Sequence, residues 1–268
     1  MRDVTFGQYY SAESFVHKMD ARIKILLSIA FIVGVFLVKE FHFYGFLTAF
    51  AFVLLTTIIA RVPFFRVLKS IKGILFFIIF SCVIQLFFNK EGTVVVEFWV
   101  IKFTDIGLLR SAFIALRITL IVLGSSLLTL TTTPVELADG IESLLSPLKI
   151  IKFPVHEFAL IMSIALRFIP SLMDETDRII KAQKARGADF ESGNISKRAK
   201  ALIPILIPLL ISSFRRADEL GDAMDARCYS GSKKRTKYKK MHLTWRDMIG
   251  FIFTAGVIAS IVFINIYL

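Results

Sequence analysis

The chain has 268 residues, 56% of them hydrophobic, and its mean hydropathy of +0.69 is well above that of a soluble domain. This composition predicts an integral membrane protein. The formal net charge of +12 comes from Lys and Arg gathered in loops between apolar segments, so it indicates membrane topology and argues against a nucleic-acid partner. The two cysteines, Cys82 and Cys228, predict neither a disulfide framework nor a metal site.

Five apolar segments predict transmembrane helices. They are residues 23–38, 43–60, 71–88, 108–131 and 248–267. The first is short for a span, which needs about 20 residues, so we expect Lys24 and Lys39 to reach the two membrane surfaces. Asp20 is placed to cap that helix. The fold class predicted is an all-α integral membrane protein with about five transmembrane helices and a cytoplasmic domain of long amphipathic coupling helices.

The loop charges predict the orientation of these spans. The connection 61–72 holds basic residues and no acid, which is typical of a cytoplasmic loop, whereas the more acidic residues 89–107 suit the outer face. Within the latter, residues 93–100 predict a short extracellular hairpin or an interfacial segment. Five crossings give a cytoplasmic N-terminus and an external C-terminus. The basic run 233–240 predicts an anchor to anionic lipid headgroups.

Two arginines lie within the fourth predicted span. Arg110 is near its end and is expected to reach the membrane surface, whereas Arg117 lies deeper. A charged side chain at that depth is costly, so it indicates a function unless neighbouring groups satisfy it. Two alternatives stay open for Arg117: a structural role, bound by carbonyls of neighbouring helices, and a direct functional role.

The sequence predicts three parts: a membrane domain (1–131), a domain at the membrane surface and in the cytoplasm (132–243) and a last transmembrane helix (244–268). The middle domain opens at a capping box, Thr133 to Glu136, with proline at the first helical position. A second capping box, from Thr244 to Asp247, opens the last helix.

Two long helical patterns follow at about residues 155–186 and 196–227, each apolar in its first half and ionic in its second. Pro170 predicts a bend in the first pattern, because proline removes a backbone donor. Pro204 and Pro208 predict a curved or broken start of the second.

The ends of these two patterns form a short internal repeat, because their residues align when the sequence is compared with itself at one constant offset. That offset places Asp177 on Asp218, Ala182 on Ala223, Ala185 on Ala226 and Arg186 on Arg227. The alanine four residues before each arginine shares its helix face, so a smooth face leads to one projecting cation. Ordinary capping explains one such end, since an arginine complements the helix dipole and Gly187 is where a left-handed cap is expected. The repetition favours two equivalent binding positions for partners.

Motifs for catalysis or cofactor binding are missing from the sequence. It contains no phosphate-binding loop, no paired His or Cys array and no Gly-x-Ser-x-Gly elbow. We therefore expect no cofactor, no resident metal and no catalysis by this chain alone.

We call the helix ends at Arg186 and Arg227 the arginine ends. With both of them, the chain resembles the transmembrane T component (EcfT) family of energy-coupling factor (ECF) transporters. The motifs that carry the resemblance are Phe15-Val16-His17-Lys18-Met19-Asp20-Ala21-Arg22-Ile23-Lys24, Thr131-Thr132-Thr133-Pro134, Leu144-Leu145-Ser146-Pro147-Leu148, Arg167-Phe168-Ile169-Pro170, Ala182-Gln183-Lys184-Ala185-Arg186-Gly187 and Ala223-Met224-Asp225-Ala226-Arg227-Cys228. Two departures are Ala21, where the family often has proline, and Cys228, where glycine is common. The second puts the cap geometry in doubt.

The resemblance implies a non-catalytic subunit of an ABC-type importer for a vitamin or trace metal. Its partners would be two cytoplasmic ABC ATPases and a membrane-embedded substrate-binding S component. The residues implied to dock on the ATPases are Ala185, Arg186, Gly187, Ala226, Arg227 and Cys228, supported by Asp177, Ala182, Asp218 and Ala223. Arg117, Arg167 and Pro170 are implied to be structural or to face the S component.

Two other classes of function are weaker. A secondary transporter would need an ionisable site at mid-depth, which only Arg117 offers, and usually two related halves, which the spans do not show. A membrane enzyme would need an acid–base pair, and none is apparent.

Overall fold

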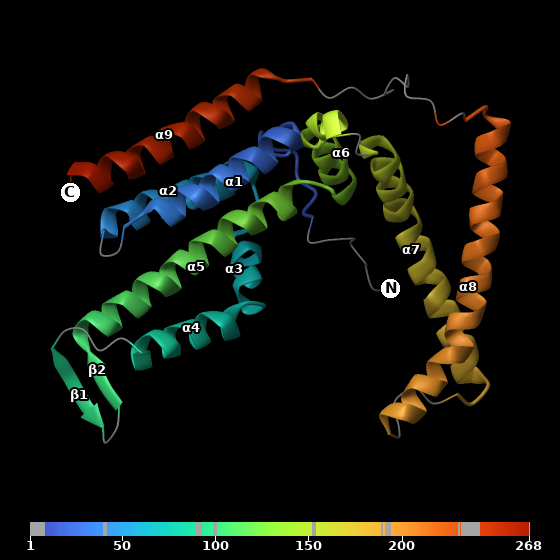
Figure 1. Cartoon of the computed structure of the whole chain (residues 1–268), viewed down its shortest axis with the longest axis horizontal. Helices are drawn as coiled ribbons and strands as arrows, with labels where there is room; N and C mark the ends of the chain where they lie inside the picture. The colour runs from blue at the N-terminus through green and yellow to red at the C-terminus, as the bar shows by residue number, and fades with distance from the viewer. Residues whose placement is uncertain are drawn as a thin grey trace. The chain divides into compact units, whose positions relative to one another are not determined.

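The computed structural model describes residues 9–39, 42–88, 93–98, 101–151, 154–188, 190, 194–229, 231 and 242–267. The basic run 233–240, with its predicted headgroup anchor, lies outside these residues. Within them, the elements are α1 (Ala21–Leu37), α2 (Phe43–Ala60), α3 (Phe64–Lys72), α4 (Leu75–Phe88), β1 (Val94–Phe98), β2 (Ile101–Thr104), α5 (Asp105–Thr131), α6 (Pro134–Leu144), the 3-10 helix η1 (Ser146–Ile151), α7 (Val155–Ala185), α8 (Ile195–Ala226) and α9 (Trp245–Tyr267) (Figure 1). The predicted all-α architecture is confirmed, with one small hairpin added.

The chain forms two compact units. The first contains Asp3–Ala159 and Met241–Leu268, and the second contains Leu160–Lys240. In the first unit, α1 packs against α5, α6 and α9, and α2 packs against α5 and α9. The second unit holds most of α7 and all of α8. Each unit is described below by itself.

Three described helices are long and apolar enough to cross a membrane: α2, α5 and α9, with 18, 27 and 23 residues. Helices α3 and α4 add a fourth span only as a broken pair, because they meet at an angle of 60°. Helix α1 has 17 residues and is therefore about 25 Å long, less than the roughly 30 Å of a hydrocarbon core. By length and composition, the structure supports three or four of the five predicted spans.

The predicted span 71–88 is wrong at its start. Helix α3 already begins at Phe64, inside the predicted connection 61–72, and α4 begins only at Leu75. Val67 of α3 is fully buried while Arg66, Lys69 and Lys72 are exposed, which is the pattern of an amphipathic helix. The basic residues at positions 66, 69 and 72 suggested a loop, although their spacing is helical.

Strands β1 and β2 form an antiparallel hairpin, with Glu97 opposite Lys102. A hairpin is thus present where residues 93–100 predicted one, and its second strand extends to Thr104. The carboxylate of Asp105 closes its base by accepting from the backbone N–H of Thr93 at 3.0 Å and from its hydroxyl at 2.9 Å. The Thr104 hydroxyl accepts from the Gly107 N–H at 3.2 Å and so caps α5.

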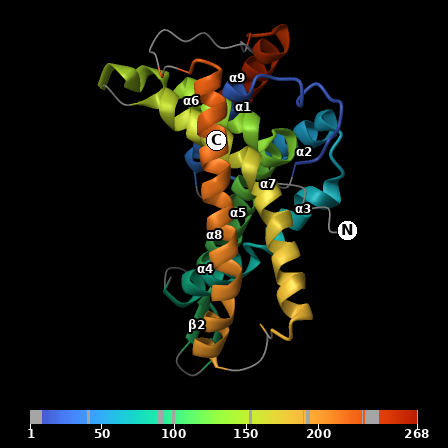
Figure 2. The same cartoon turned by 90° about the vertical axis from the view of Figure 1, so that its right-hand side faces the viewer.

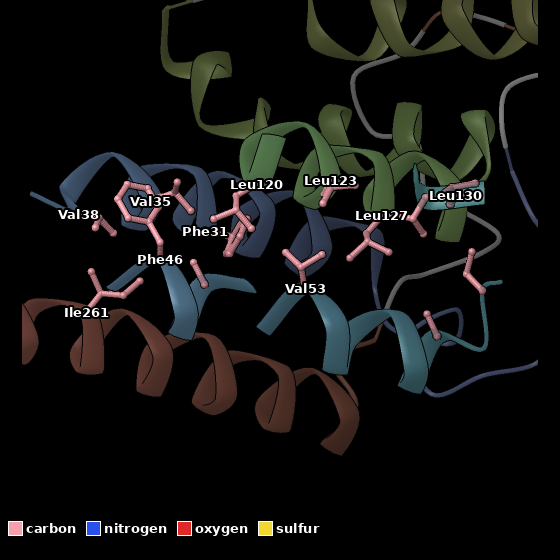
Figure 3. Packing of buried hydrophobic residues seen from close by; sticks show 14 residues of the cluster. Phe31, Val35, Val38, Phe46, Val53, Leu120, Leu123, Leu127, Leu130 and Ile261 are labelled. Atoms are coloured by element: carbon pink, nitrogen blue, oxygen red, sulfur yellow. The ribbon is translucent and has the colours of Figure 1, made fainter. Parts of the chain in front are cut away.

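A hydrophobic core joins the helices of the first unit. Phe31 and Val35 of α1, Phe46 and Val53 of α2, Leu120, Leu123 and Leu127 of α5, and Ile261 of α9 meet there (Figure 3). Gly124 allows α1 and α5 to pack closely, since a Cβ at that position would overlap the Phe31 ring. The helices therefore pack through one shared layer of side chains.

Polar contacts tie the N-terminal ends of α1 and α9 together. The Asp247 side chain, 2% exposed as a residue, accepts from the backbone N–H of Asp20 at 2.9 Å and of Thr244 at 2.7 Å. The second bond is one half of the predicted capping box. Asp20 in turn caps α1 by accepting from the Arg22 N–H at 2.9 Å, as predicted. One carboxylate therefore serves the starts of two helices.

Lys24, which was predicted to reach a membrane surface, is buried among the helices of the first unit. It is 6% exposed, and its ammonium donates to the carbonyls of Thr131 at 3.0 Å, at the end of α5, and of His17 at 3.1 Å. Carbonyls at a helix C-terminus lack partners within the helix, so a cation is favoured there. Nearby, burial lowers the pKa of His17 below 6.5, while its ring hydrogen bonds to Ser14 and to the Tyr10 carbonyl.

At their opposite ends, α1 and α9 are joined again. The Lys39 ammonium donates to the Asn265 carbonyl at 2.9 Å, and the Asn265 amide donates to the Leu37 carbonyl at 2.6 Å. Because both ends of the pair are fastened, α1 and α9 run parallel along their whole length.

Replacing Asp247 by alanine is expected to lower the Tm of the purified protein in detergent. The change removes the acceptor of two backbone N–H groups, and an unpaired buried donor costs about 1–3 kcal/mol. Asp222→Ala, at an exposed position on α8, is the matched control and should leave Tm unchanged. Equal Tm values for the two variants would contradict this role of Asp247.

Candidate functional site

Helix α7 ends in a Schellman cap built on a left-handed glycine. Gly187 has φ of +87°, a conformation that suits a residue without a Cβ. The Gly187 N–H donates to the Lys184 carbonyl at 3.0 Å, and the Ala188 N–H donates to the Gln183 carbonyl at 3.0 Å. These two bonds define the motif and place Arg186 at the last position before the chain turns away.

Helix α8 ends in the same cap, with a cysteine in the left-handed position. Cys228 has φ of +56°, and its N–H donates to the Asp225 carbonyl at 2.9 Å. The Tyr229 N–H donates to the Met224 carbonyl at 3.0 Å. The doubt that Cys228 raised about cap geometry is thus resolved: the geometry is kept, and a left-handed non-glycine residue costs about 1–2 kcal/mol.

The two arginines occupy equivalent places. Arg186 and Arg227 are both exposed, at the same position of two matching caps. In the described part of the chain, neither guanidinium group has a hydrogen-bond or ion-pair partner. An exposed guanidinium offers five donors in a planar fork that fits a carboxylate on another molecule.

The residues predicted to support these ends fall into two groups. Ala182 and Ala223 are exposed one turn before their arginines, on the same helix face. Ala185 and Ala226, the last residues of the two helices, are exposed as well. Asp177 and Asp218 are exposed too, but nine residues correspond to two and a half helical turns, so they lie on the opposite side. The structure therefore groups the alanines with the arginines and separates the aspartates from them.

The remaining predicted positions lie elsewhere. Arg117 of α5 donates to the Val38 carbonyl at 2.5 Å, and its guanidinium lies 5.6 Å from the centre of the Phe46 ring. This contact with the end of α1 corresponds to the structural alternative for Arg117. Arg167 and Pro170 are exposed on α7, which continues as helix through the proline.

A polar bridge between α7 and α8 was missed by the sequence reasoning. The Arg216 guanidinium of α8 donates to the Ser171 hydroxyl at 2.5 Å and to the Glu175 carboxylate at 2.5 Å. The side chains of Arg216 and Glu175 are 27% and 20% exposed. The repeat carried a signal for it, because the same shift that superimposes the arginine ends places Glu175 on Arg216.

The cap of α8 provides a test of backbone strain. Cys228→Gly is expected to stabilise the last turn of α8 by about 1 kcal/mol, because glycine adopts a positive φ without steric cost. Hydrogen–deuterium exchange of the peptide that ends at Tyr229 should slow about fivefold. Gly187→Ala is the reciprocal control and should accelerate exchange at the end of α7. Unchanged exchange in both variants would contradict the cap assignment.

Comparison with known proteins gives one consistent family. The family model CbiQ, described as cobalt transport protein, matches residues 12–238. The energy-coupling factor transporter transmembrane protein EcfT of Clostridium kluyveri is 49% identical over 252 residues, which cover 93% of this chain and 92% of that protein. The proteins of the same name from Ruminiclostridium cellulolyticum and Bacillus subtilis are 49% and 43% identical, over 93% and 98% of this chain and 92% and 98% of theirs. The family match covers helices α1 to α8 and both helix ends that carry Arg186 and Arg227, and the relatives cover nine tenths or more of the chain, so the chain belongs to the EcfT family, the transmembrane components of energy-coupling factor transporters.

Proposed function

We propose that this chain couples ATP hydrolysis by two ABC ATPases to an S component that binds a vitamin or trace metal. The observation that carries the proposal is the pair of exposed guanidinium groups at matching helix caps. Each would form a bidentate, charge-assisted bond with an acidic group of one ATPase, a geometry that lysine does not reproduce. The small side chains of Ala182 and Ala223 would let each helix end approach its partner closely.

The long helices suit the transmission of movement. ATP binding would close the ATPase dimer and displace the two arginine ends, and α7 and α8 would carry that displacement towards the membrane. The first half of α8 presents exposed apolar side chains, including Leu202, Leu206 and Leu210, as a surface for the S component. Arg167 and Pro170 of α7 are proposed to contribute to that surface or to its support.

The proposed topology follows from the loop charges. The N-terminus lies in the cytoplasm and the C-terminus outside, in a prokaryotic cell membrane. Residues 132–243 act as the coupling domain, between the membrane domain 1–131 and the transmembrane helix 244–268, and the basic run 233–240 holds to anionic headgroups.

Charge reversal at the arginine ends tests this function. Arg186→Glu and Arg227→Glu should each reduce copurification of the ATPases about tenfold or more, because a charge-assisted bond worth about 1.5–3 kcal/mol is replaced by repulsion. Affinity purification from native membranes identifies the ATPases, the S component and its cargo. Uptake of that cargo should be lost while the variant still inserts into the membrane.

Matched controls are available on the same helices. Arg178→Glu on α7 and Arg215→Glu on α8 reverse exposed arginines away from the caps and should leave copurification unchanged. Normal copurification and uptake in the Arg186→Glu, Arg227→Glu double variant would refute the proposal. Uptake driven by an ion gradient without ATPases would favour a secondary transporter instead.

A further inference from the structure

The bridge between α7 and α8 joins positions that are equivalent in the internal repeat. The separation of Glu175 and Arg216 along the chain equals that of Arg186 and Arg227. Glu175 therefore precedes Arg186 by the same number of residues as Arg216 precedes Arg227. That stretch makes three turns of helix, so each helix extends about 16 Å from the bridge to its arginine.

Helices α7 and α8 run in opposite directions. Figure 1 and Figure 2 show the end of α7 near the start of α8, while the end of α8 lies far from it. Few residues separate the end of α7 at Ala185 from the start of α8 at Ile195, which keeps these two ends close together. When two antiparallel helices meet at equivalent residues, a local twofold axis passes through the meeting point, and the two arginines lie on opposite sides of it.

The hydrogen bonds of Arg216 to Ser171 and Glu175 restrict the movement of α7 and α8 where they cross. Both terminal nitrogens of the Arg216 guanidinium donate hydrogen bonds: Nη1 donates to the Ser171 hydroxyl and Nη2 to the Glu175 carboxylate. Ser171 and Glu175 lie one turn apart on α7. Three partly shielded groups in a fixed geometry restrict movement more than an isolated exposed ion pair, which contributes about 0–1 kcal/mol. Ser171 also follows Pro170, where α7 lacks one backbone hydrogen bond.

We propose that Arg216, with Ser171 and Glu175, is a positioning brace that fixes the separation and symmetry of the two arginine ends. The brace sits at the local twofold axis, with equal arms of helix on each side that contain no proline. A dimer of two ATPases has related docking grooves, so two equal arms present one arginine to each. This inference rests on the coupling function proposed above and assigns to Arg216 the placement of both contacts.

The separation of the helix ends can be measured directly in the full-length chain. Spin labels on native Cys228 and on Ala188→Cys, in a Cys82→Ser background, report the distance between the two caps by double electron–electron resonance. Two opposed helix segments of about 16 Å each, with the labels just beyond their ends, predict a separation of up to about 35 Å. Arg216→Ala should broaden the distance distribution about twofold, because the crossing is no longer held.

A charge exchange separates a positioning role from a general loss of structure. The double variant Glu175→Arg, Arg216→Glu restores opposite charges across the crossing and should narrow the distribution again. Arg215→Ala removes the neighbouring exposed arginine and is the matched control. Arg216→Ala should also reduce ATPase copurification about fivefold, and the charge exchange should recover it.

The outcomes distinguish the brace from the coupling function. A distance distribution in Arg216→Ala equal to that of the unmodified chain overturns the brace, whatever the arginine ends do. A broadened distribution that the charge exchange does not narrow also overturns it, since the loss then comes from packing. If the Arg186→Glu, Arg227→Glu variant keeps full copurification, the coupling function fails while the distance measurement still decides whether Arg216 positions the helix ends.

Discussion

A left-handed residue after each long helix is the constraint on which the candidate site depends. Once Gly187 or Cys228 takes a positive φ, two backbone bonds close the helix and the chain leaves at a sharp angle. The arginine just before that residue then has no further helical turn to pack against. Its guanidinium points into solvent because of the backbone geometry, whichever side chain occupies the left-handed position. The same backbone therefore produces the same projecting cation twice.

In the first unit, which holds the candidate membrane spans, charged side chains bind the unpaired backbone groups of helix ends. Its helices begin and end with backbone groups that lack partners, and lipid supplies none. Asp247 satisfies N–H groups at the starts of α1 and α9, and Lys24 satisfies a carbonyl at the end of α5. Arg117 does the same at the end of α1. Three charged side chains of this unit thus bind backbone groups at helix ends.

Much of this could be predicted because it depends on local sequence. The capping box at Thr133 and the cap at Asp20 follow from residue types at fixed spacings, and the structure contains both. The matched arginine ends follow from the internal repeat. Helix α3 was missed because its basic residues resemble a cytoplasmic loop when its helical period is ignored. The functional roles of the arginine ends remain predictions that the proposed variants address.

Contacts between residues far apart in the sequence could not be predicted from local sequence patterns. Nothing near Lys24 in the sequence indicates that Thr131 would accept from it, since 107 residues separate them. The burial of Lys24 depends on how α1 meets α5, which in turn depends on the close approach at Gly124. The Arg216 bridge was accessible in principle, because the repeat places a carboxylate and a guanidinium at equivalent positions, but this required extending the comparison beyond the helix ends.

The two caps have the same backbone conformation, but they expose different side chains. At one, the left-handed residue presents only hydrogen; at the other, Cys228 presents an exposed thiol beside Arg227. A protein that covers the second cap must accommodate a polarisable sulfur atom that the first cap lacks. Two identical subunits would therefore meet unequal chemistry at matching positions, whereas two different subunits could each recognise their own end.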